Sequence, residues 1–245
     1  MSLEVGLNLK RCRACNRVSV VKYTMQCMDG TQTPYYLCCC GTIWHEEPID
    51  YSKFNASYVV EMRKQKFLQE RLNHFRRVYM PLIEENLYGR ESLDIGFCFP
   101  ENIVDMRERG WIADGIDLIK NDYLTGDFET YDFKGRRYDL VIMSHVMASA
   151  KDPIKFLRKA CGLLRGGGLL YISAPDTSLC LALGYKEFTH WFRENKTMLS
   201  MERTMEECLK AGMEKQPLAS IQSMSKRFIY TNEFHLLMKK GIELE

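Results

Sequence analysis

The chain has 245 residues, which is enough for one sizeable hydrophobic core with a small appended module. Its charged fraction of 27% and aromatic fraction of 11% argue against a disordered chain, and its formal net charge of +2 gives no general attraction to nucleic acid or membranes. No apolar run approaches the ~20 residues of a membrane span, and residues 1–6 lack the pattern of a secretory signal. We therefore expect a cytoplasmic protein with no membrane partner.

Cysteines are concentrated near the start of the chain, where six of the ten lie before residue 41. This clustering is typical of metal binding rather than of a secreted disulfide scaffold. Cys12 and Cys15 are separated by two residues, a spacing that lets both thiolates point at one ion. Cys38 and Cys40 can form a second such knuckle, because Gly41 permits the positive φ that the turn needs.

Two short predicted strands, at residues 18–27 and 34–37, flank a turn signal at residues 28–31. The resulting hairpin brings the two cysteine pairs together. We therefore predict a structural, tetrahedral zinc ribbon, whose ligands are Cys12, Cys15, Cys38 and Cys40. Cys39 and His45 are the alternative ligands, because the Cys-x-Cys spacing of the second knuckle is tighter than usual. A reduced cysteine-rich patch without metal is the competing interpretation.

Helices are predicted for residues 52–87, where apolar side chains recur at intervals of mostly three and four residues. Pro81 is expected to end or kink the first helix near Met80, because proline cannot donate the helical hydrogen bond. Basic residues outnumber acidic ones between residues 53 and 77. A solvated helix face is the commoner meaning of such a pattern, and a nucleic-acid surface is the alternative.

Beyond residue 90 the pattern alternates between strands and helices. Strands are predicted at residues 92–95, 111–116, 137–143 and 169–173, and helices at residues 102–109, 153–164 and 201–211. We expect the glycines at positions 166–168 to end the second of these helices. The alternating order implies an α/β fold with a parallel sheet, right-handed crossovers and a ligand site at the carboxyl ends of the strands.

Five segments of this region carry recognisable motifs, namely Leu93-Asp94-Ile95-Gly96, Gly115-Ile116-Asp117, Gly126-Asp127-Phe128, residues 138–146 and residues 163–175. In this order they resemble the motifs of the class I S-adenosylmethionine-dependent methyltransferases. A Cys-x-x-Cys ribbon ahead of the domain also occurs in the small-molecule branches of that family. The resemblance covers residues 92–176 and extends more loosely to residue 245.

The resemblance implies a Rossmann-like, doubly wound, mostly parallel sheet that binds S-adenosylmethionine. Asp117 falls where the family has the acid that binds the ribose hydroxyls, and one strand-end carboxylate can accept from both hydroxyls of a diol. Asp127 and Phe128 fall where the family contacts the adenine. The predicted cofactor-binding residues are Asp94, Gly96, Phe97, Cys98, Asp117, Asp127, Phe128, Ser144 and His145.

The sequence departs from the family pattern at three places. Gly96-Phe97-Cys98-Phe99-Pro100 stands where the family usually has Gly-x-Gly-x-Gly, so the Cys98 side chain narrows the space for the methionine part of the cofactor. Ala148-Ser149 stands where many relatives have Glu-His. Residues 118–123 are too few for the helix that normally precedes the third strand, so we expect that helix to be reduced or absent.

Methyl transfer asks little of the protein beyond alignment of the acceptor with an already activated methyl group. A base helps if the acceptor has a proton to lose. His190, in the segment that follows the fifth strand, is our first candidate for that base, whereas we expect His145 to line the pocket. For each of these histidines a packed structural side chain is the ordinary interpretation.

We predict a zinc-ribbon-like module in residues 1–50, a helical connector in residues 51–90 and a Rossmann-like methyltransferase domain in residues 91–245. The predicted function is methyl transfer from S-adenosylmethionine to a small-molecule or sugar-like acceptor. One alternative is a catalytically degenerate binding or scaffold protein. The other is an RNA or DNA methyltransferase, which is disfavoured because residues 144–147 lack the acceptor motif of the amino-methylating DNA enzymes.

Overall fold

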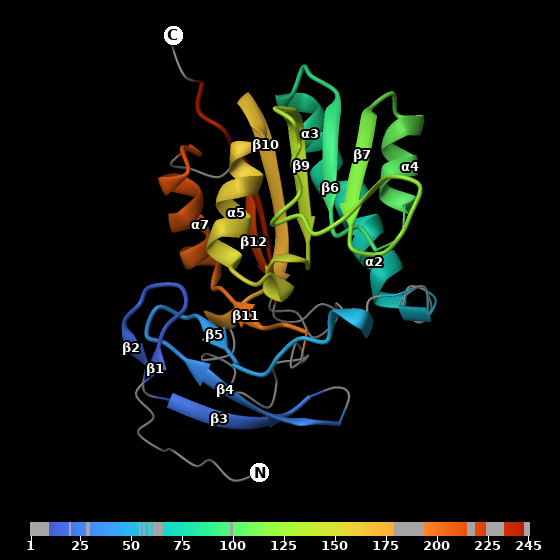
Figure 1. Cartoon of the computed structure of the whole chain (residues 1–245). Helices are drawn as coiled ribbons and strands as arrows, with labels where there is room; N and C mark the ends of the chain where they lie inside the picture. The colour runs from blue at the N-terminus through green and yellow to red at the C-terminus, as the bar shows by residue number, and fades with distance from the viewer. Residues whose placement is uncertain are drawn as a thin grey trace.

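The computed structural model (Figure 1) contains a seven-stranded sheet, a four-stranded sheet and a two-stranded hairpin in the part of the chain that it describes. The described residues are 10–242, except residues 20, 28–29, 54, 56, 59, 61–65, 99, 179–193, 215–218 and 224–232. The seven-stranded sheet lies above the four-stranded sheet in this view, and the carboxyl ends of its central strands face the smaller sheet.

The larger sheet has the strand order β12-β13-β10-β9-β6-β7-β8. Its strands are β6 (Glu91–Ile95), β7 (Ile112–Asp117), β8 (Leu124–Thr125), β9 (Tyr138–Ser144), β10 (Leu164–Pro175), β12 (Ala219–Ser223) and β13 (Glu233–Lys239). Strand β13 runs antiparallel to both of its neighbours, β12 and β10, while β8, β7, β6, β9 and β10 are parallel to one another. The predicted mostly parallel, Rossmann-like sheet is therefore confirmed.

Helices cover both faces of this sheet (Figure 1). They are α2 (Lys66–His74), the π-helical turn η2 (Phe75–Tyr79), α3 (Met80–Asn86), α4 (Glu101–Glu108), α5 (Pro153–Gly162) and α7 (Met201–Lys210). Strand β9 contributes to both layers because its side chains alternate. Val141 and Met143 pack toward α5 and α7, and Leu140 and Ile142 pack toward the other layer with Tyr79. The sheet is thus doubly wound.

The glycines at positions 166–168 do not end a helix, so that expectation was wrong. Helix α5 begins at its cap, Asp152, whose side chain accepts from the N–H groups of Ile154 and Lys155, and it ends at Gly162. The chain then enters β10 at Leu164, and the three glycines lie where the register between β10 and β9 shifts. A side chain at Gly168 would place its Cβ 3.0 Å from the carbonyl oxygen of Asp139, so the glycine permits close approach of the strands.

The N-terminal residues form the predicted hairpin. Its strands are β3 (Val21–Gln26) and β4 (Gln32–Leu37), which pair antiparallel, and β1 (Lys10–Arg11) and β2 (Val18–Ser19) form the separate two-stranded hairpin. Two further strands, β5 (Ile43–Trp44) and β11 (Thr197–Met198), complete the order β11-β5-β4-β3. Strand β11 follows β10 in the chain, so the ribbon sheet includes a segment that lies far from the ribbon in sequence.

The predicted connector helices are present as α2, η2 and α3. Helical geometry changes from α to π over η2 and returns to α at Met80. Pro81 sits in the first turn of α3, where its missing N–H removes the bond that would continue a regular α-helix from α2. The 3-10 turn η1 (Tyr51–Lys53) precedes this connector. None of the helices in the described ranges has the length and apolar character needed to cross a membrane.

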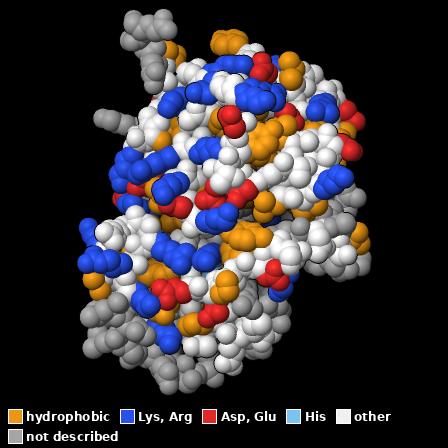
Figure 2. All heavy atoms as spheres, in the orientation of Figure 1, with side chains coloured by type: hydrophobic (Ala, Val, Ile, Leu, Met, Phe, Trp, Pro, Cys, Tyr) orange, Lys and Arg blue, Asp and Glu red, His pale blue; other side chains and the backbone are white. Residues whose placement is uncertain are grey.

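Basic side chains are spread over the ribbon and the larger domain on the face shown in Figure 2, with acidic side chains among them. One network of ion pairs around a buried carboxylate connects the larger domain to the ribbon. Glu207 of α7 is 1% exposed and forms ion pairs with Arg158, Arg203 and Lys210. Arg203 also donates to the carbonyl oxygen of Ala14 at 2.8 Å, in the loop between the first two cysteines. This network ties the ribbon to α7.

Candidate functional site

Two adjoining cavities lie at the carboxyl ends of β6, β7 and β9. The larger has a volume of about 340 Å³ and the smaller about 180 Å³. Tyr58, Gly96, Cys98 and His145 line both of them. Open α/β sheets bind ligands at the carboxyl ends of their strands. Because the two cavities share lining residues, one elongated ligand can extend from one cavity into the other.

The structure brings the predicted cofactor-binding residues together around these cavities. The larger cavity is lined by Gly96, Cys98, Asp117, Asp127, Phe128 and His145, and the smaller by Asp94, Gly96, Phe97, Cys98, Ser144 and His145. All nine predicted residues therefore border one cavity or the other. The predicted base His190 lies outside the described residues.

Asp117 ends β7 and connects two loops of the larger cavity. Its Oδ2 accepts from the N–H of Cys98 at 2.8 Å, and its Oδ1 accepts from the N–H of Ile119 at 2.9 Å. Burial raises the pKa of Asp117, and these backbone hydrogen bonds oppose that shift. Residues 118–123, all of which are described, contain no helix, as expected. These hydrogen bonds thus fix the orientation of the Asp117 carboxylate at the carboxyl end of β7.

The loop after β6 depends on two left-handed residues. Gly96 has φ of +67°, and a Cβ there would lie 2.4 Å from Cγ2 of Val146, so no other residue fits without rearrangement. Cys98 has φ of 57°. This is the backbone conformation that glycine adopts readily, so the loop keeps a glycine-like shape at the position where the sequence lacks the second glycine.

Replacing Cys98 with glycine tests whether its side chain closes the cofactor cavity. Because the cavity is open with the cysteine in place, we expect the affinity for S-adenosylhomocysteine to change less than about threefold, or about 0.7 kcal/mol. The free energy of unfolding should rise by about 0.5–1 kcal/mol, since relief of left-handed strain exceeds the entropic cost of glycine. Calorimetry and urea denaturation measure the two effects. A large gain in affinity would instead mean that Cys98 blocks the site.

The far end of the larger cavity is lined by Asp127 and Phe128. Asp127 pairs with Lys151, whose Nζ lies 2.6 Å from Oδ2. Phe128 is 5% exposed and its ring centroid lies 4.6 Å from that of Phe156, so it belongs to both the core and the cavity wall. This end offers one flat apolar surface beside one acidic group.

The smaller cavity has one acidic and one basic side chain on its walls. Asp94 is 5% exposed, and its Oδ2 accepts from Nδ2 of Asn102 at 2.8 Å. Burial raises the pKa of Asp94 to about 7, against the effect of that hydrogen bond. Arg71 of α2 brings a guanidinium to the same cavity. Ser144 bonds to Ser173 at 3.0 Å between their hydroxyl oxygens.

Several lining residues were not predicted because they come from segments outside the recognised motifs. Tyr51 and Tyr58 enter from the segment between the ribbon and α2, and Arg71 enters from α2 itself. Tyr51 donates to the carbonyl oxygen of Ser149 at 3.1 Å. The excess of basic residues in the connector was the one available signal for Arg71. Such an excess more often indicates a solvated helix face, so it does not single out Arg71.

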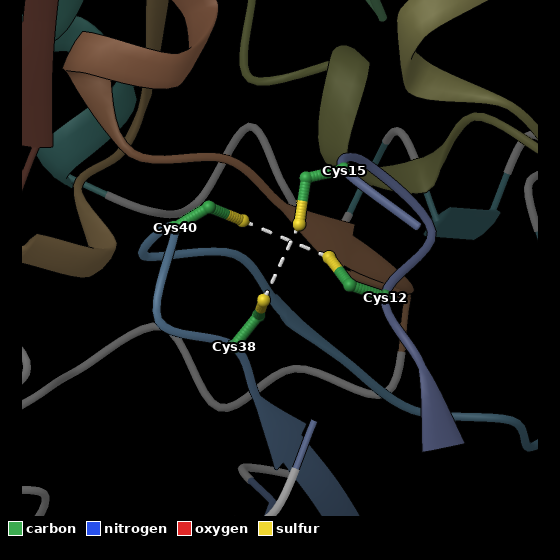
Figure 3. A group of neighbouring side chains, drawn as sticks. All are labelled: Cys12, Cys15, Cys38 and Cys40. Atoms are coloured by element: carbon green, nitrogen blue, oxygen red, sulfur yellow. Dashed lines mark hydrogen bonds between the residues drawn. The ribbon is translucent and has the colours of Figure 1, made fainter. Parts of the chain in front are cut away.

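A second site is formed by four cysteine sulfur atoms (Figure 3). Cys12, Cys15, Cys38 and Cys40 place their Sγ atoms within 4.8 Å of one another. Sγ of Cys12 lies 3.7 Å from that of Cys40, and Sγ of Cys15 lies 3.5 Å from that of Cys38. Four thiolates about 2.3 Å from one zinc ion are about 3.8 Å apart in a tetrahedron, so this donor set fits the metal.

Neither alternative ligand belongs to this group. Cys39 is exposed, and its Sγ accepts from Nη1 of Arg17 at 3.8 Å. His45 is buried directly after β5, where its ring makes an edge contact with Tyr35 at 5.2 Å between centroids. The predicted set of four cysteines is therefore the one that the structure brings together.

Comparison with known proteins adds a family and a fold. Residues 65–212 match the family model described as a methyltransferase domain. No curated protein sequence matches the chain. The solved structure of magnesium protoporphyrin IX methyltransferase from Synechocystis PCC 6803, with bound S-adenosylhomocysteine, is similar with a TM-score of 0.57 and 16% identity, covering 78% of this chain and 97% of that chain.

Two further solved structures show the same likeness. A chain of the complex between the Haloferax volcanii Trm112 methyltransferase activator and a methyltransferase has a TM-score of 0.58 at 14% identity, covering 80% of this chain and 100% of that chain. An S-adenosylmethionine-dependent methyltransferase from Archaeoglobus fulgidus has a TM-score of 0.53 at 17% identity, covering 74% and 99%. At these identities the likeness establishes the shared fold.

Proposed function

Because this chain belongs to the methyltransferase domain family, we propose that it transfers a methyl group from S-adenosylmethionine to a small-molecule or sugar-like acceptor in the cytoplasm. The observation that carries the proposal is the pair of adjoining cavities, whose polar groups match the two ends of this cofactor. The cofactor supplies a methyl group on a positively charged sulfur, which is activated for transfer without further chemistry by the protein.

The larger cavity suits the nucleoside end. Asp117 would accept from the two ribose hydroxyls, since its carboxylate is already oriented by the N–H groups of Cys98 and Ile119. Phe128 would face the adenine ring, and Asp127 would lie near its exocyclic amino group. A flat apolar surface with one acceptor is what an aminopurine requires.

The smaller cavity suits the amino-acid end, which carries one ammonium and one carboxylate. Arg71 would bind the carboxylate and Asp94 would bind the ammonium. Oδ1 of Asn102 is buried and has no hydrogen-bond partner within the described residues, so it offers a further acceptor to the ammonium. An orphaned acceptor beside an acidic group supports the fit, because unpaired buried polar atoms are costly.

We further propose that the cysteine group holds a structural zinc ion. Four thiolate ligands leave no open position for a substrate or water, so the ion would stabilise the ribbon rather than take part in methyl transfer. Tyr51 directly follows the ribbon, lines the larger cavity and donates to the carbonyl oxygen of Ser149, so it links the ribbon segment to the cofactor site.

Calorimetry with S-adenosylhomocysteine tests the cofactor assignment. We expect Asp117→Asn to weaken binding about 10-fold to 100-fold, because hydrogen bonds to a charged group contribute about 1.5–3 kcal/mol. The matched control is Asp122→Asn, which removes one exposed carboxylate from the same loop and should leave the affinity unchanged. If the wild-type protein binds neither S-adenosylmethionine nor S-adenosylhomocysteine at millimolar concentration, the proposed function is wrong.

A further inference from the structure

A buried carboxylate lies behind the smaller cavity, outside every motif described above. Glu233 begins β13 and is 0% exposed. Arg71 donates to its Oε1 through Nη2, and Nε2 of His145 lies 3.1 Å from its Oε2. A buried carboxylate requires such partners, because an isolated one would be strongly destabilising. The three side chains come from β13, α2 and the end of β9.

His145 is the member of this group that faces the ligand site. It lines both cavities, and its side chain is 16% exposed. Its φ of 56° is a left-handed conformation that costs a non-glycine residue free energy. Strained residues of this kind persist where the surrounding structure enforces them, and they concentrate at functional sites. Here the strained residue lies at the boundary between the cavities.

The position of His145 relative to a bound cofactor follows if the proposed function holds, and this step rests on it. S-adenosylmethionine would place its nucleoside in the larger cavity and its amino-acid group in the smaller one. Its sulfur lies between those two parts. The wall shared by the cavities, which includes Gly96, Cys98 and His145, is therefore where the transferable methyl group would lie.

We propose that His145, oriented by Glu233, accepts the proton that the acceptor loses during methyl transfer. This assigns to His145 the role that sequence reasoning gave to His190. It also defines the substrate class as a nucleophile with a removable proton, such as a phenolic or enolic hydroxyl, rather than a thioether or tertiary amine. Glu233 is a positioning residue in this arrangement, because it acts through the imidazole.

A hydroxyl acceptor loses its proton and gains the methyl group. The O–H bond breaks and its proton binds Nδ1 of His145, since Nε2 faces Glu233. The freed electron pair on oxygen forms the new O–CH₃ bond, while the electron pair of the broken S–CH₃ bond stays on sulfur. The products are the methyl ether, neutral S-adenosylhomocysteine and an imidazolium paired with Glu233, which returns its proton to water.

The charges around His145 favour its neutral form before the reaction. Burial lowers the pKa of His145 and the positive charge of Arg71 lowers it further, whereas Glu233 opposes both. The neighbouring His235 is also buried, and burial lowers its pKa to about 3, so it carries no charge at neutral pH. A neutral imidazole with a lone pair on Nδ1 is the form that accepts a proton.

Nitrogen NMR of the full-length protein with ¹⁵N-labelled histidine rings tests this proposal with two known probes. S-adenosylmethionine and S-adenosylhomocysteine differ at the methyl-bearing, charged sulfur. At about pH 7.5 we expect neutral His145 protonated on Nε2 in both complexes, with ring signals that shift between them. His45 is buried directly after β5, outside the lining of both cavities, and should give the same signals in both complexes. A His145→Gln variant assigns the signals.

The outcomes separate this proposal from the proposed function. If calorimetry detects neither probe, the proposed function fails. If both probes bind but His145 gives identical signals in the two complexes, or carries its proton on Nδ1, the proton-acceptor role is wrong. Glu233→Gln should change the tautomer populations of His145, because it removes the charge that faces Nε2. The wild-type comparison requires no variant, so it decides the question even if Glu233→Gln fails to fold.

Discussion

Glu233→Ala is expected to lower the free energy of unfolding by about 3–5 kcal/mol, one of the largest effects of any single substitution in this protein. Glu233 is 0% exposed, and its removal takes away the carboxylate that Nη2 of Arg71 contacts, while the Arg71 side chain is only 14% exposed. Removal of one member of a buried ion pair is costly because the remaining charge loses its close counter-charge while it is poorly hydrated. Urea denaturation followed by circular dichroism measures the change.

Glu206→Ala is the matched control for Glu233→Ala. Glu206 also pairs with an arginine, Arg203, but its side chain is 58% exposed, so its removal should change stability by less than about 1 kcal/mol. The double variant Arg71→Met, Glu233→Leu removes both charges and should recover most of the lost stability. If Glu233→Ala and Glu206→Ala changed the free energy of unfolding equally, the Arg71–Glu233 pair would contribute no more than an exposed ion pair.

The fold was predictable because its signals are local. The strands around Ile95, Ile116, Val141 and Ile172 are short apolar runs, and each of these four side chains is at most 1% exposed. Their alternation with helical patterns limits the topology to a parallel sheet with right-handed crossovers. The cysteine knuckles were predictable for a similar reason, because the spacing within each pair and one hairpin determine where four sulfur atoms meet.

The Arg71–Glu233–His145 group could not be predicted, because it depends on long-range packing. Arg71 and Glu233 are 162 positions apart in the chain, and no local pattern relates them. Glu233 reads in isolation as an ordinary charged residue at the start of an apolar strand. Only the antiparallel pairing of β13 with β10, opposite Pro175, brings it to the carboxyl end of β9. Motif reasoning finds residues near glycine turns and strand ends, and it misses partners from other layers.

The misplaced helix end shows a different limit. A run of three glycines usually ends a helix, and the prediction relied on that tendency. In the structure the helix has already ended at Gly162, because Leu164 begins to pair with Tyr138 in the sheet. Tertiary pairing of β10 with β9 therefore overrides the local signal.

The second large effect concerns the metal. We expect Cys15→Ser to release about one zinc ion per chain and to unfold the ribbon. In small zinc modules, metal binding contributes about 10 kcal/mol and supplies most of the folding free energy. Elemental analysis measures the zinc, and limited proteolysis locates the unfolded segment. New cleavage sites should lie within residues 10–50, while the core around Val141 and Ile172 should stay resistant.

Cys39→Ser is the matched control for Cys15→Ser, because Cys39 lies in the same segment but outside the group of four sulfur atoms. It should retain zinc and the wild-type cleavage pattern.

Unfolding of the ribbon should also weaken binding of S-adenosylhomocysteine, since Tyr51 lines the nucleoside cavity and β11 pairs with β5 across the two parts of the molecule. Metal-free protein with an intact, protease-resistant ribbon would contradict the zinc assignment. Zinc loss with unchanged cofactor affinity would instead show that the ribbon is energetically separate from the methyltransferase domain.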